Sequence, residues 1–383
     1  MRIIHYIGMD VHTTNYTLCD LSRRINPISG DVEDRMGCPI TIAPDYKLVV
    51  KFVDKLRSMN PTDDVSFICG YEAGCLGYSL YHQLTDCGIE CVILAPSTMA
   101  VSRDSNVKKN DKRDAAVIAK CLAFSTFKSV FIPSEQDDQV KEYIRMRDDH
   151  KQQLKENKQQ ILGFCHRHGM TCEHSNWSQN HLKWLKEYPL SPIYRETLDE
   201  YLRSYAYLAD KIESLDQRIK EFAQTPEYKS RVDKLVCLVG VQEHTALATI
   251  VETGDFSRFP TANHYAAYLG LIPAERSSGN KQGHYSITKA GNAHIRTLLT
   301  ESANCFSRRK AGQKSAPLKE RQSRNSREVI AYADKANERL RRRFQHLVFS
   351  GKKHNVAKVA VARELACFIW GLMTDHIDLL GVG

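Results

Sequence analysis

Apolar strand-like runs alternate with helix-like segments along residues 1 to about 130, and this alternation constrains the fold most. The expected strands cover residues 3–9, 15–20, 65–71 and 89–94, and the expected helices cover residues 46–58, 75–87 and 111–124. The alternation of strands and helices predicts an α/β domain built on a sheet. Ligands bind such open sheets where strands end, so side chains at those positions are the first candidates for a functional site.

Carboxylates stand at the ends of two expected strands and at the start of one expected helix. Asp10 closes the first apolar run, and Glu72 closes the run at residues 65–71. Asp111 and Asp114 open the helix-like stretch and, being three residues apart, share one helix face. Four carboxylates cannot all ionise at low cost in one place, so together they imply a hard cation such as Mg²⁺.

Each of these acids also has an ordinary interpretation. Asp10 could be a turn residue or a helix cap, Glu72 could be a solvated loop carboxylate, and Asp111 could be an N-cap. Their common placement at strand ends and a helix start favours a shared site.

Charge and cysteine content limit the class of protein. The 383-residue chain has a net charge of +9, from 54 Lys and Arg against 45 Asp and Glu, which favours a polyanionic partner. Twelve cysteines are scattered along the chain and no secretory signal precedes them. No run reaches the ~18 apolar residues of a membrane span. We therefore expect a cytoplasmic protein with reduced cysteines and no membrane partner.

Residues 131–225 form a second region rich in charge. Residues 195–222 carry apolar residues at spacings of three and four, which predicts an amphipathic helix, and the charged, glutamine-rich residues 135–164 are similar in style, so two long helices are expected. They could form an antiparallel hairpin or dimerise as a coiled coil. The Cys and His residues between Cys165 and His174 lack the paired spacing of zinc ligands, and a helix end with Gly169 as its stop is the favoured interpretation.

Residues 226–383 form a third, mostly helical region. Gly240 lies in an expected helix–turn–helix, which could bind a DNA backbone through its amides or be a plain helical hairpin. Further on, Ser278 precedes a glycine in an expected polar loop. A serine there could be an exposed nucleophile or simply a turn former.

At this point the chain resembles a known family, the DEDD-type insertion-sequence transposases, which are bridge-RNA-guided recombinases. The resemblance covers nearly the whole chain and follows the expected order, although a second glycine is more usual after Gly240. The motifs that carry it are Gly8-Met9-Asp10, Tyr71-Glu72-Ala73-Gly74, Lys109-Asn110-Asp111-Lys112-Arg113-Asp114-Ala115, Phe256-Ser257-Arg258-Phe259, Leu269-Gly270-Leu271-Ile272-Pro273, Ser277-Ser278-Gly279, Ile287-Thr288-Lys289-Ala290-Gly291-Asn292 and Val359-Ala360-Val361-Ala362-Arg363-Glu364-Leu365.

The resemblance implies a fold and a mechanism. Residues 1–130 would form an RNase H-like (RuvC-like) α/β domain, residues 131–225 a coiled-coil oligomerisation segment, and residues 226–383 a helical transposase domain. Mg²⁺ would be held by Asp10, Glu72, Asp111 and Asp114. Ser278, with Ser277 as the second candidate, would attack DNA to give a covalent phosphoserine link.

The resemblance also implies partners. These are the DNA of element ends and target, a noncoding bridge RNA that pairs with both, and further copies of the chain in a dimer or tetramer, associated with a prokaryotic nucleoid. The residues expected to contact nucleic acid are Lys108, Lys109, Arg113, Arg276, Lys281, Lys289 and Arg296. The runs Arg308-Arg309-Lys310 and Arg341-Arg342-Arg343 could also bind phosphates.

Two other functions remain open on the sequence alone. A metal-dependent nuclease or junction resolvase would hydrolyse DNA with water and would need the four acids but not Ser278. A nucleic-acid-binding scaffold would need neither. The general base for Ser278 also stays open among Lys281, His284 and Arg276, its neighbours in the sequence.

Overall fold

The computed structural model describes residues 2–61, 63–74, 76–99, 110–278, 281–307 and 312–377, without the side chains of residues 97, 275–278 and 281–285. The chain divides into two compact units, Met1–Ile132 and Pro133–Gly383. Among the described residues, no helix has both the length and the apolar character needed to cross a membrane.

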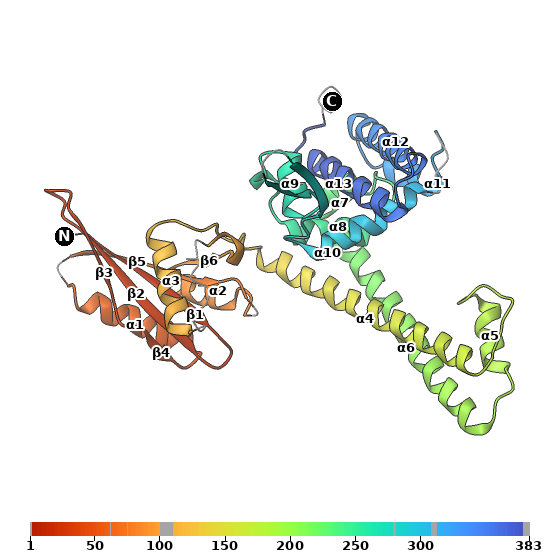
Figure 1. The fold of residues 1–383 in the computed structure, drawn as a ribbon, viewed down its shortest axis with the longest axis horizontal. Coiled ribbons are helices and arrows are strands. Elements are labelled where there is room, and N and C mark those ends of the chain that lie inside the picture. The colour runs from red at the N-terminus through yellow and green to blue at the C-terminus, as the bar shows by residue number, and fades with distance from the viewer. Residues whose placement is uncertain are drawn as a thin grey trace. The chain divides into compact units, whose positions relative to one another are not determined.

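The first unit is a six-stranded sheet with helices packed against it (Figure 1). Its elements are β1 (Arg2–Val11), β2 (Tyr16–Ile25), β3 (Val32–Met36), β4 (Ile40–Ile42), α1 (Tyr46–Ser58), β5 (Asp64–Glu72), α2 (Ser79–Asp86), β6 (Glu90–Leu94), the short 3₁₀ helix η1 (Pro96–Thr98) and α3 (Asp111–Ala123). The strand order is β3-β2-β1-β5-β6, and β4 also pairs with β2. Strands β1, β5 and β6 run parallel, whereas β2 is antiparallel to β1, β3 and β4. The carboxyl ends of β1 and β5 therefore meet at one edge of the sheet.

Alternation along β1 sends its side chains into two different cores. Ile7 and Met9 are buried in the core that α1 and α2 also line. Tyr6 lies on the opposite face and packs against α3. Asp10 follows at an even-numbered position, so the strand directs it to the face that α3 covers, and His12 comes directly after the last residue of the strand.

The backbones of α3 and β1 touch at Gly8. A Cβ atom built on Gly8 would lie 2.2 Å from the carbonyl oxygen of Ala115 and 2.2 Å from the amide nitrogen of Ala119. Any side chain at this position would push the helix away, because packed protein interiors have no room for such an overlap. The contact thus holds the first turn of α3 close to the end of β1.

The second unit is mostly helical (Figure 1). Its elements are α4 (Glu135–Arg167), α5 (Gln179–Glu187), α6 (Pro192–Ala223), α7 (Lys229–Leu235), α8 (Glu243–Thr253), η2 (Phe256–Arg258), α9 (Ala262–Tyr268), β7 (Pro273–Ser278), β8 (Lys281–Ile287), α10 (Ala293–Ser302), η3 (Ala303–Ser307), α11 (Ala316–Gln322), α12 (Arg327–Phe349) and α13 (His354–Met373). Its largest core surrounds α13, whose Val361, Leu365 and Ile369 are fully buried against residues of α8, α10 and α12.

Helices α4 and α6 form a long antiparallel hairpin, here called the arm (Figure 1). One end of the arm joins the large core through Ile144 and Ile219. The other end, with α5, has a separate core that contains Phe164 and Leu202. Of the two arrangements left open by the sequence, the structure shows the hairpin.

The sequence predicted the elements of the first unit well, apart from the positions of their ends. All four strands and three helices expected in residues 1–130 are present, and β3 and β4 are additional. The interpretation of Gly169 as a helix stop is confirmed, since α4 ends beside it and its φ is +64°. The polar loop expected around Ser278 was wrong, because β7 and β8 form an antiparallel hairpin with Ser278 opposite Lys281.

The contact at Gly8 leads to a first prediction. Gly8→Ala should destabilise the packing of α3 on β1 by about 1–3 kcal/mol, the usual cost of overpacking. Hydrogen exchange of peptides covering residues 2–11 and 111–123 should therefore speed up by about tenfold or more. Gly74→Ala is the matched control, because its Cβ would meet only the carbonyl oxygen of Glu72 at an ordinary 3.8 Å. Equal exchange in the two variants would contradict the role given to Gly8.

Candidate functional site

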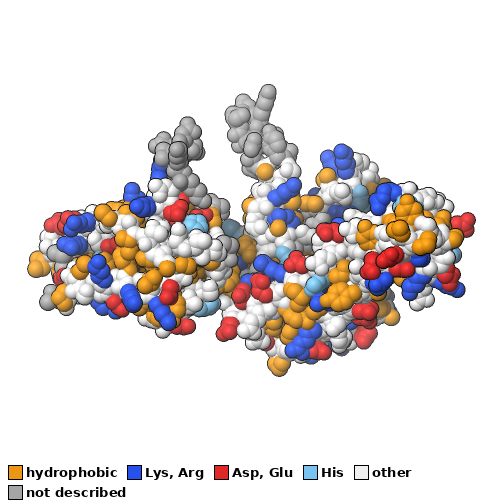
Figure 2. Space-filling model, turned by 90° about the horizontal axis from the view of Figure 1, so that it is seen from below, with side chains coloured by type: hydrophobic (Ala, Val, Ile, Leu, Met, Phe, Trp, Pro, Cys, Tyr) orange, Lys and Arg blue, Asp and Glu red, His pale blue; other side chains and the backbone are white. Residues whose placement is uncertain are grey.

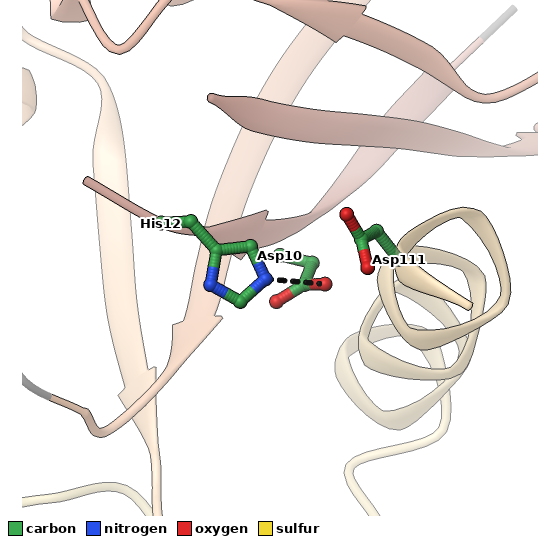
Figure 3. Close-up of side chains that lie close together, drawn as sticks. All are labelled: Asp10, His12 and Asp111. Carbon is green, nitrogen blue, oxygen red and sulfur yellow. Dashed lines mark ion pairs between the residues drawn. The ribbon is translucent and has the colours of Figure 1, made fainter. Parts of the chain in front are cut away.

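The acidic residues of the first unit meet where β1 ends and α3 begins. Ligand atoms of Asp10, His12 and Asp111 all lie within 4.8 Å of one another (Figure 3). Asp10 and His12 come from the end of β1, and Asp111 projects towards them from the first turn of α3 (Figure 3). The Gly8 contact explains why residues a hundred positions apart in the sequence come together here.

The cap of α3 decides one of the alternatives for Asp111. The side chain of Asn110 accepts a hydrogen bond from the amide of Lys112, so Asn110 is the N-cap. Asp111 is the first residue inside the helix, and its interpretation as an N-cap was wrong. Asp111 and Asp114 also place two carboxylates at the positive end of the helix dipole, where negative charge stabilises the helix.

The other two predicted acids, Asp114 and Glu72, lie near this cluster, but their carboxylates are not among the ligand atoms within 4.8 Å of one another. Asp114 is partly buried on the same helix, and its charge acts on Asp10. Glu72 ends β5, which pairs with β1 in the register Met9 to Tyr71. Glu72 is therefore the next residue along on the neighbouring strand, but it is exposed and its carboxylate is not within the 4.8 Å cluster.

Asp10 is the acid of the cluster whose pKa is raised. Burial raises the pKa of its carboxyl group, and the negative charges of Asp111 and Asp114 raise this pKa further, while the nearby His12 opposes the rise. His12 Nε2 lies 3.3 Å from Asp10 Oδ2 (Figure 3). The same buried oxygen has no hydrogen-bond partner among the described residues. A buried carboxylate oxygen that faces a second carboxylate, with His12 Nε2 at 3.3 Å but no hydrogen bond of good geometry, is a place where a cation would be stabilised.

The donor set fits a divalent metal ion. Two carboxylates supply the oxygen ligands that Mg²⁺ and Mn²⁺ prefer, and both ions retain waters that substrate oxygens can replace. His12 adds a nitrogen donor, which suits Mn²⁺ or another transition metal better than Mg²⁺. Sequence reasoning missed His12, although it comes only two residues after Asp10, directly after the last residue of the strand.

In the second unit, two loops that contain family-like motifs are in direct contact at the base of the β7–β8 hairpin. Gly270 and Gly291 both have positive φ, of +65° and +76°. A Cβ on Gly270 would lie 2.1 Å from the carbonyl oxygen of Ala290, and one on Gly291 would lie 1.9 Å from that of Tyr268. Glycine is required twice over here, by conformation and by space. The contact fixes the base of the hairpin whose first strand ends at Ser278.

A charged network joins the start of α10 to α4 and α8. Glu252, whose side chain is 3% exposed, accepts hydrogen bonds from Arg145 (2.8 and 3.0 Å) and from Asn292 (2.8 Å). His294 Nδ1 lies 3.0 Å from Glu252 Oε1, and His294 Nε2 lies 2.7 Å from Asp148 Oδ2. Because both ring nitrogens face carboxylates, both must donate, so His294 is an imidazolium.

Further contacts complete this network around Asp148. Arg147 donates to Asp148 at 2.8 Å and to Asp216 of α6 at 2.6 and 2.8 Å. His244 Nε2 lies 3.1 Å from Asp148 Oδ1. Sequence reasoning missed all of these residues, since they lie on separate helices and only the fold brings them together.

The pKa values of the network follow from this geometry. Burial alone would lower the pKa of His294, but its two carboxylate partners outweigh burial and raise the pKa to about 9. Burial would raise the pKa of Glu252, but hydrogen bonds from His294, Arg145 and Asn292 lower it to about 2. The pKa of Asp148 also falls well below its usual value, because the close approach of His244 and the hydrogen bonds from His294 and Arg147 outweigh burial.

The residues predicted to contact nucleic acid differ in their exposure and in their contacts. Lys108 and Lys109 lie outside the described residues, as do the side chains of Arg276, Ser277, Ser278 and Lys281. Arg113 is exposed on α3, and Lys289 is exposed beside the hairpin base. Arg296 instead donates to the carbonyl oxygens of Leu269 (2.9 Å) and Ala290 (3.3 Å), which gives it a structural role at that base.

Comparison with known proteins gives a consistent result along the chain. The profile of the Transposase IS116/IS110/IS902 family matches residues 233–320, and a transposase profile of the DEDD type of IS110 matches residues 7–167. The chain is 33% identical over 308 residues to the putative transposase y4qE of Sinorhizobium fredii (strain NBRC 101917 / NGR234), an alignment that covers 80% of this chain and 75% of the relative.

Two further relatives are similar over different lengths. The transposase for insertion sequence element IS1533 of Leptospira borgpetersenii is 27% identical over 357 residues, 91% of this chain and 98% of the relative. A pilin gene-inverting protein of Moraxella bovis is 31% identical over 147 residues, 36% of this chain and 45% of the relative.

The acidic cluster predicts how metal and stability are linked. Mn²⁺ should raise the melting temperature of the wild-type protein, because it binds the folded site. Asp10→Asn should abolish this rise and should leave the metal-free melting temperature equal or higher, since it removes a carboxylate whose ionised form is disfavoured. Thermal unfolding with Mn²⁺ and with EDTA checks both expectations. Asp34→Asn is the control, because that carboxylate is paired with Arg23 away from the cluster. A metal-induced rise that survives Asp10→Asn would rule out the site.

The network around His294 predicts a pH dependence. Its folded pKa of about 9 lies above the ordinary value of 6.5, so the imidazolium adds stability that is complete below pH 6.5. This contribution, on the order of 3 kcal/mol at 1.36 kcal/mol per pKa unit, should disappear as the pH rises from 6.5 through 9. Urea unfolding of the wild type and of His294→Asn across this range measures it. The variant should be less stable at pH 6 and lack the decline, whereas His150→Asn, whose ring faces Gln153, should behave as the wild type.

Proposed function

The chain belongs to the IS116/IS110/IS902 transposase family, and on that premise we propose that it cuts and rejoins DNA at insertion-sequence ends and targets with a metal-binding acidic site and a serine nucleophile. The family implies a DNA partner, dependence on a divalent metal and an RNase H-like α/β fold for the first unit. The mixed sheet with helices packed against it is consistent with that fold.

One observation carries the proposal for the first unit. Asp10 and Asp111, from a strand end and a helix start, bring their carboxylates together at the buried Asp10 Oδ2, which His12 Nε2 approaches to 3.3 Å without a hydrogen bond of good geometry. Such an arrangement is unfavourable without a cation. In the proposal Asp10 and Asp111 hold the ion, Asp114 adds negative charge, and Glu72 completes the set from the neighbouring strand. Mg²⁺ is the proposed ion.

The metal, when bound, would neutralise negative charge on the scissile phosphate. The residues of the chain have separate tasks. Asp10 and Asp111 fix where the phosphate is held, because they fix where the positive charge is. The partly exposed His12 presents a ring nitrogen beside the cluster, where it can hydrogen-bond to a group that approaches the ion.

The second unit would supply the nucleophile. In the proposed step the hydroxyl of Ser278 gives up its proton as Oγ bonds to phosphorus, one P–O bond of the DNA backbone breaks, and the departing oxygen takes up a proton to become a hydroxyl, so no net proton is gained or lost. Reversal with a different hydroxyl rejoins the strands without an external energy source. The proposal rests on the motif Ser277-Ser278-Gly279, on the fixed base of its hairpin, and on family membership.

Two partners belong to the same proposal. A noncoding bridge RNA would select the DNA by base pairing, so that the protein need contact only backbone and shape. Copies of the chain would associate as dimers or tetramers, with the arm as the proposed contact.

A hydrolytic nuclease is the second candidate. The acidic cluster would suffice for it, because metal-assisted hydrolysis needs no protein nucleophile. It differs from the proposal in leaving no covalent link to DNA.

Covalent trapping separates the two candidates. Protein, Mg²⁺, co-purified RNA and DNA with the element's junction are mixed and run on a denaturing gel. Wild type should give a protein–DNA adduct, whereas Ser278→Ala and Asp10→Asn should each reduce it by at least about a hundredfold, since one removes the nucleophile and the other the metal. Ser277→Ala is the matched control and should retain the adduct. Cleaved DNA without an adduct, unchanged in Ser278→Ala, would mean hydrolysis and would overturn the serine mechanism.

A further inference from the structure

The excess positive charge of the chain is concentrated in one segment. Residues 308–358 hold 16 of the 54 Lys and Arg but only 4 of the 45 Asp and Glu. The rest of the chain therefore has 38 basic against 41 acidic residues and is slightly acidic. On the face drawn in Figure 2, basic and acidic side chains are interspersed on both units. A polyanion would thus be attracted chiefly by the segment that contains α11, α12 and the start of α13.

A groove along α12 gathers part of this charge. It has a volume of about 740 Å³ and is lined by Lys335, Glu338, Arg339, Arg342, Arg343, His346 and Glu364. All but Glu364, which α13 supplies, come from α12. The spacings from Lys335 onward are those of one helix face, and at 1.5 Å per residue the stripe is about 16 Å long. This length equals about five base-pair steps of 3.4 Å.

The three consecutive arginines of α12 differ in their exposure and in their contacts. Arg341 has a side chain only 10% exposed and forms a bidentate pair with Glu338. Arg342 is 74% exposed and Arg343 is 45% exposed. Consecutive residues on a helix point in different directions, so Arg341 is structural while the other two reach the groove.

Two carboxylates inside the groove hold these cations in place. Glu364 Oε2 accepts from Arg339 Nε at 3.1 Å, and Glu364 Oε1 lies 3.4 Å from Arg343 Nε. Glu338 Oε1 accepts from Arg342 Nε at 2.9 Å. Four Lys and Arg against two Glu leave the groove positive. Partly exposed ion pairs of this kind are weak and exchange readily with phosphate oxygens, which match the guanidinium geometry.

The lining also indicates which part of a nucleic acid would bind. The groove has no Phe, Tyr or Trp among its lining residues, whereas proteins that bind unpaired bases stack them on aromatic side chains. Charged groups without base-reading or stacking partners contact the sugar-phosphate backbone.

We propose that the α12 groove, through Lys335, Arg339, Arg342 and Arg343, binds the phosphate backbone of double-stranded DNA without regard to sequence. This deepens the proposed function, which requires a DNA partner. It assigns to α12 a contact that is separate from the acidic cluster and from Ser278. Each cation that meets a phosphate releases a counterion and so adds to the salt dependence of binding.

Fluorescence anisotropy with a labelled duplex of arbitrary sequence tests the proposal. The full chain is titrated over a range of NaCl concentrations, all variants in the Asp10→Asn background so that the DNA is not cut. Arg342→Gln/Arg343→Gln should lower the slope of log K against log [NaCl] by about 2 and weaken binding about tenfold to a hundredfold near 0.1 M salt. Arg203→Gln/Arg218→Gln, which removes two exposed arginines of α6, is the matched control and should retain the wild-type slope.

A variant expected to gain affinity shows whether a loss of binding in the double variant is due merely to misfolding. Glu364→Gln frees Arg339 and Arg343 from their carboxylate and should strengthen DNA binding severalfold, which an unfolded protein cannot do. An unchanged salt slope in the double variant, or weaker binding by Glu364→Gln, would overturn the proposal. A parallel arm with duplex RNA decides the partner: dependence on the groove for RNA alone would overturn the assignment to DNA. Binding is read without cleavage, so the result stands whatever covalent trapping shows.

Discussion

The contact between α3 and β1 at Gly8 decides the geometry of the first unit. Backbone touches backbone there, so the helix cannot slide or lift without losing the packing of its whole inner face. The start of α3 is thereby held beside the end of β1, and Asp111 faces Asp10 although their charges repel. Packing of apolar and glycine residues supplies the free energy that keeps two carboxylates together.

The pKa values of two buried carboxylates, one in each unit, are shifted in opposite directions. Glu252 is surrounded by donors, and its pKa falls to about 2 because every neighbour stabilises the charge. Asp10 is also partly buried but has acidic neighbours, and its pKa rises. The same three physical terms, burial, charge and hydrogen bonding, act in both places. A carboxylate whose oxygens all accept hydrogen bonds, such as that of Glu252, stabilises the structure. A carboxylate with an oxygen that accepts none, such as that of Asp10, is available to bind a cation.

The sequence predicted the regular elements of both units because their signals are local. Alternation in β1 and the three-and-four spacing in α6 are set by neighbours in the chain. The strands β7 and β8 were missed because most of their residues are polar, and the hairpin depends on backbone pairing above a base that Gly270 and Gly291 allow to close. The acidic cluster was anticipated from strand ends, but His12 was not. The network around His294 could not be predicted, since its members lie on α4, α8 and α10 and no local spacing relates them.

The arm has a consequence for motion. Its two ends are anchored in separate cores, but between Arg147 and Ile161 the only buried residue of α4 is Asn157, and between Leu202 and Ile212 α6 has no buried residue. The two helices stay in contact there, for example where Lys158 Nζ lies 5.5 Å from the Tyr205 ring centroid, but little apolar surface is fully buried between them. Such a rod is stiff in length and compliant in bending, so its tip can be displaced sideways while both cores stay intact.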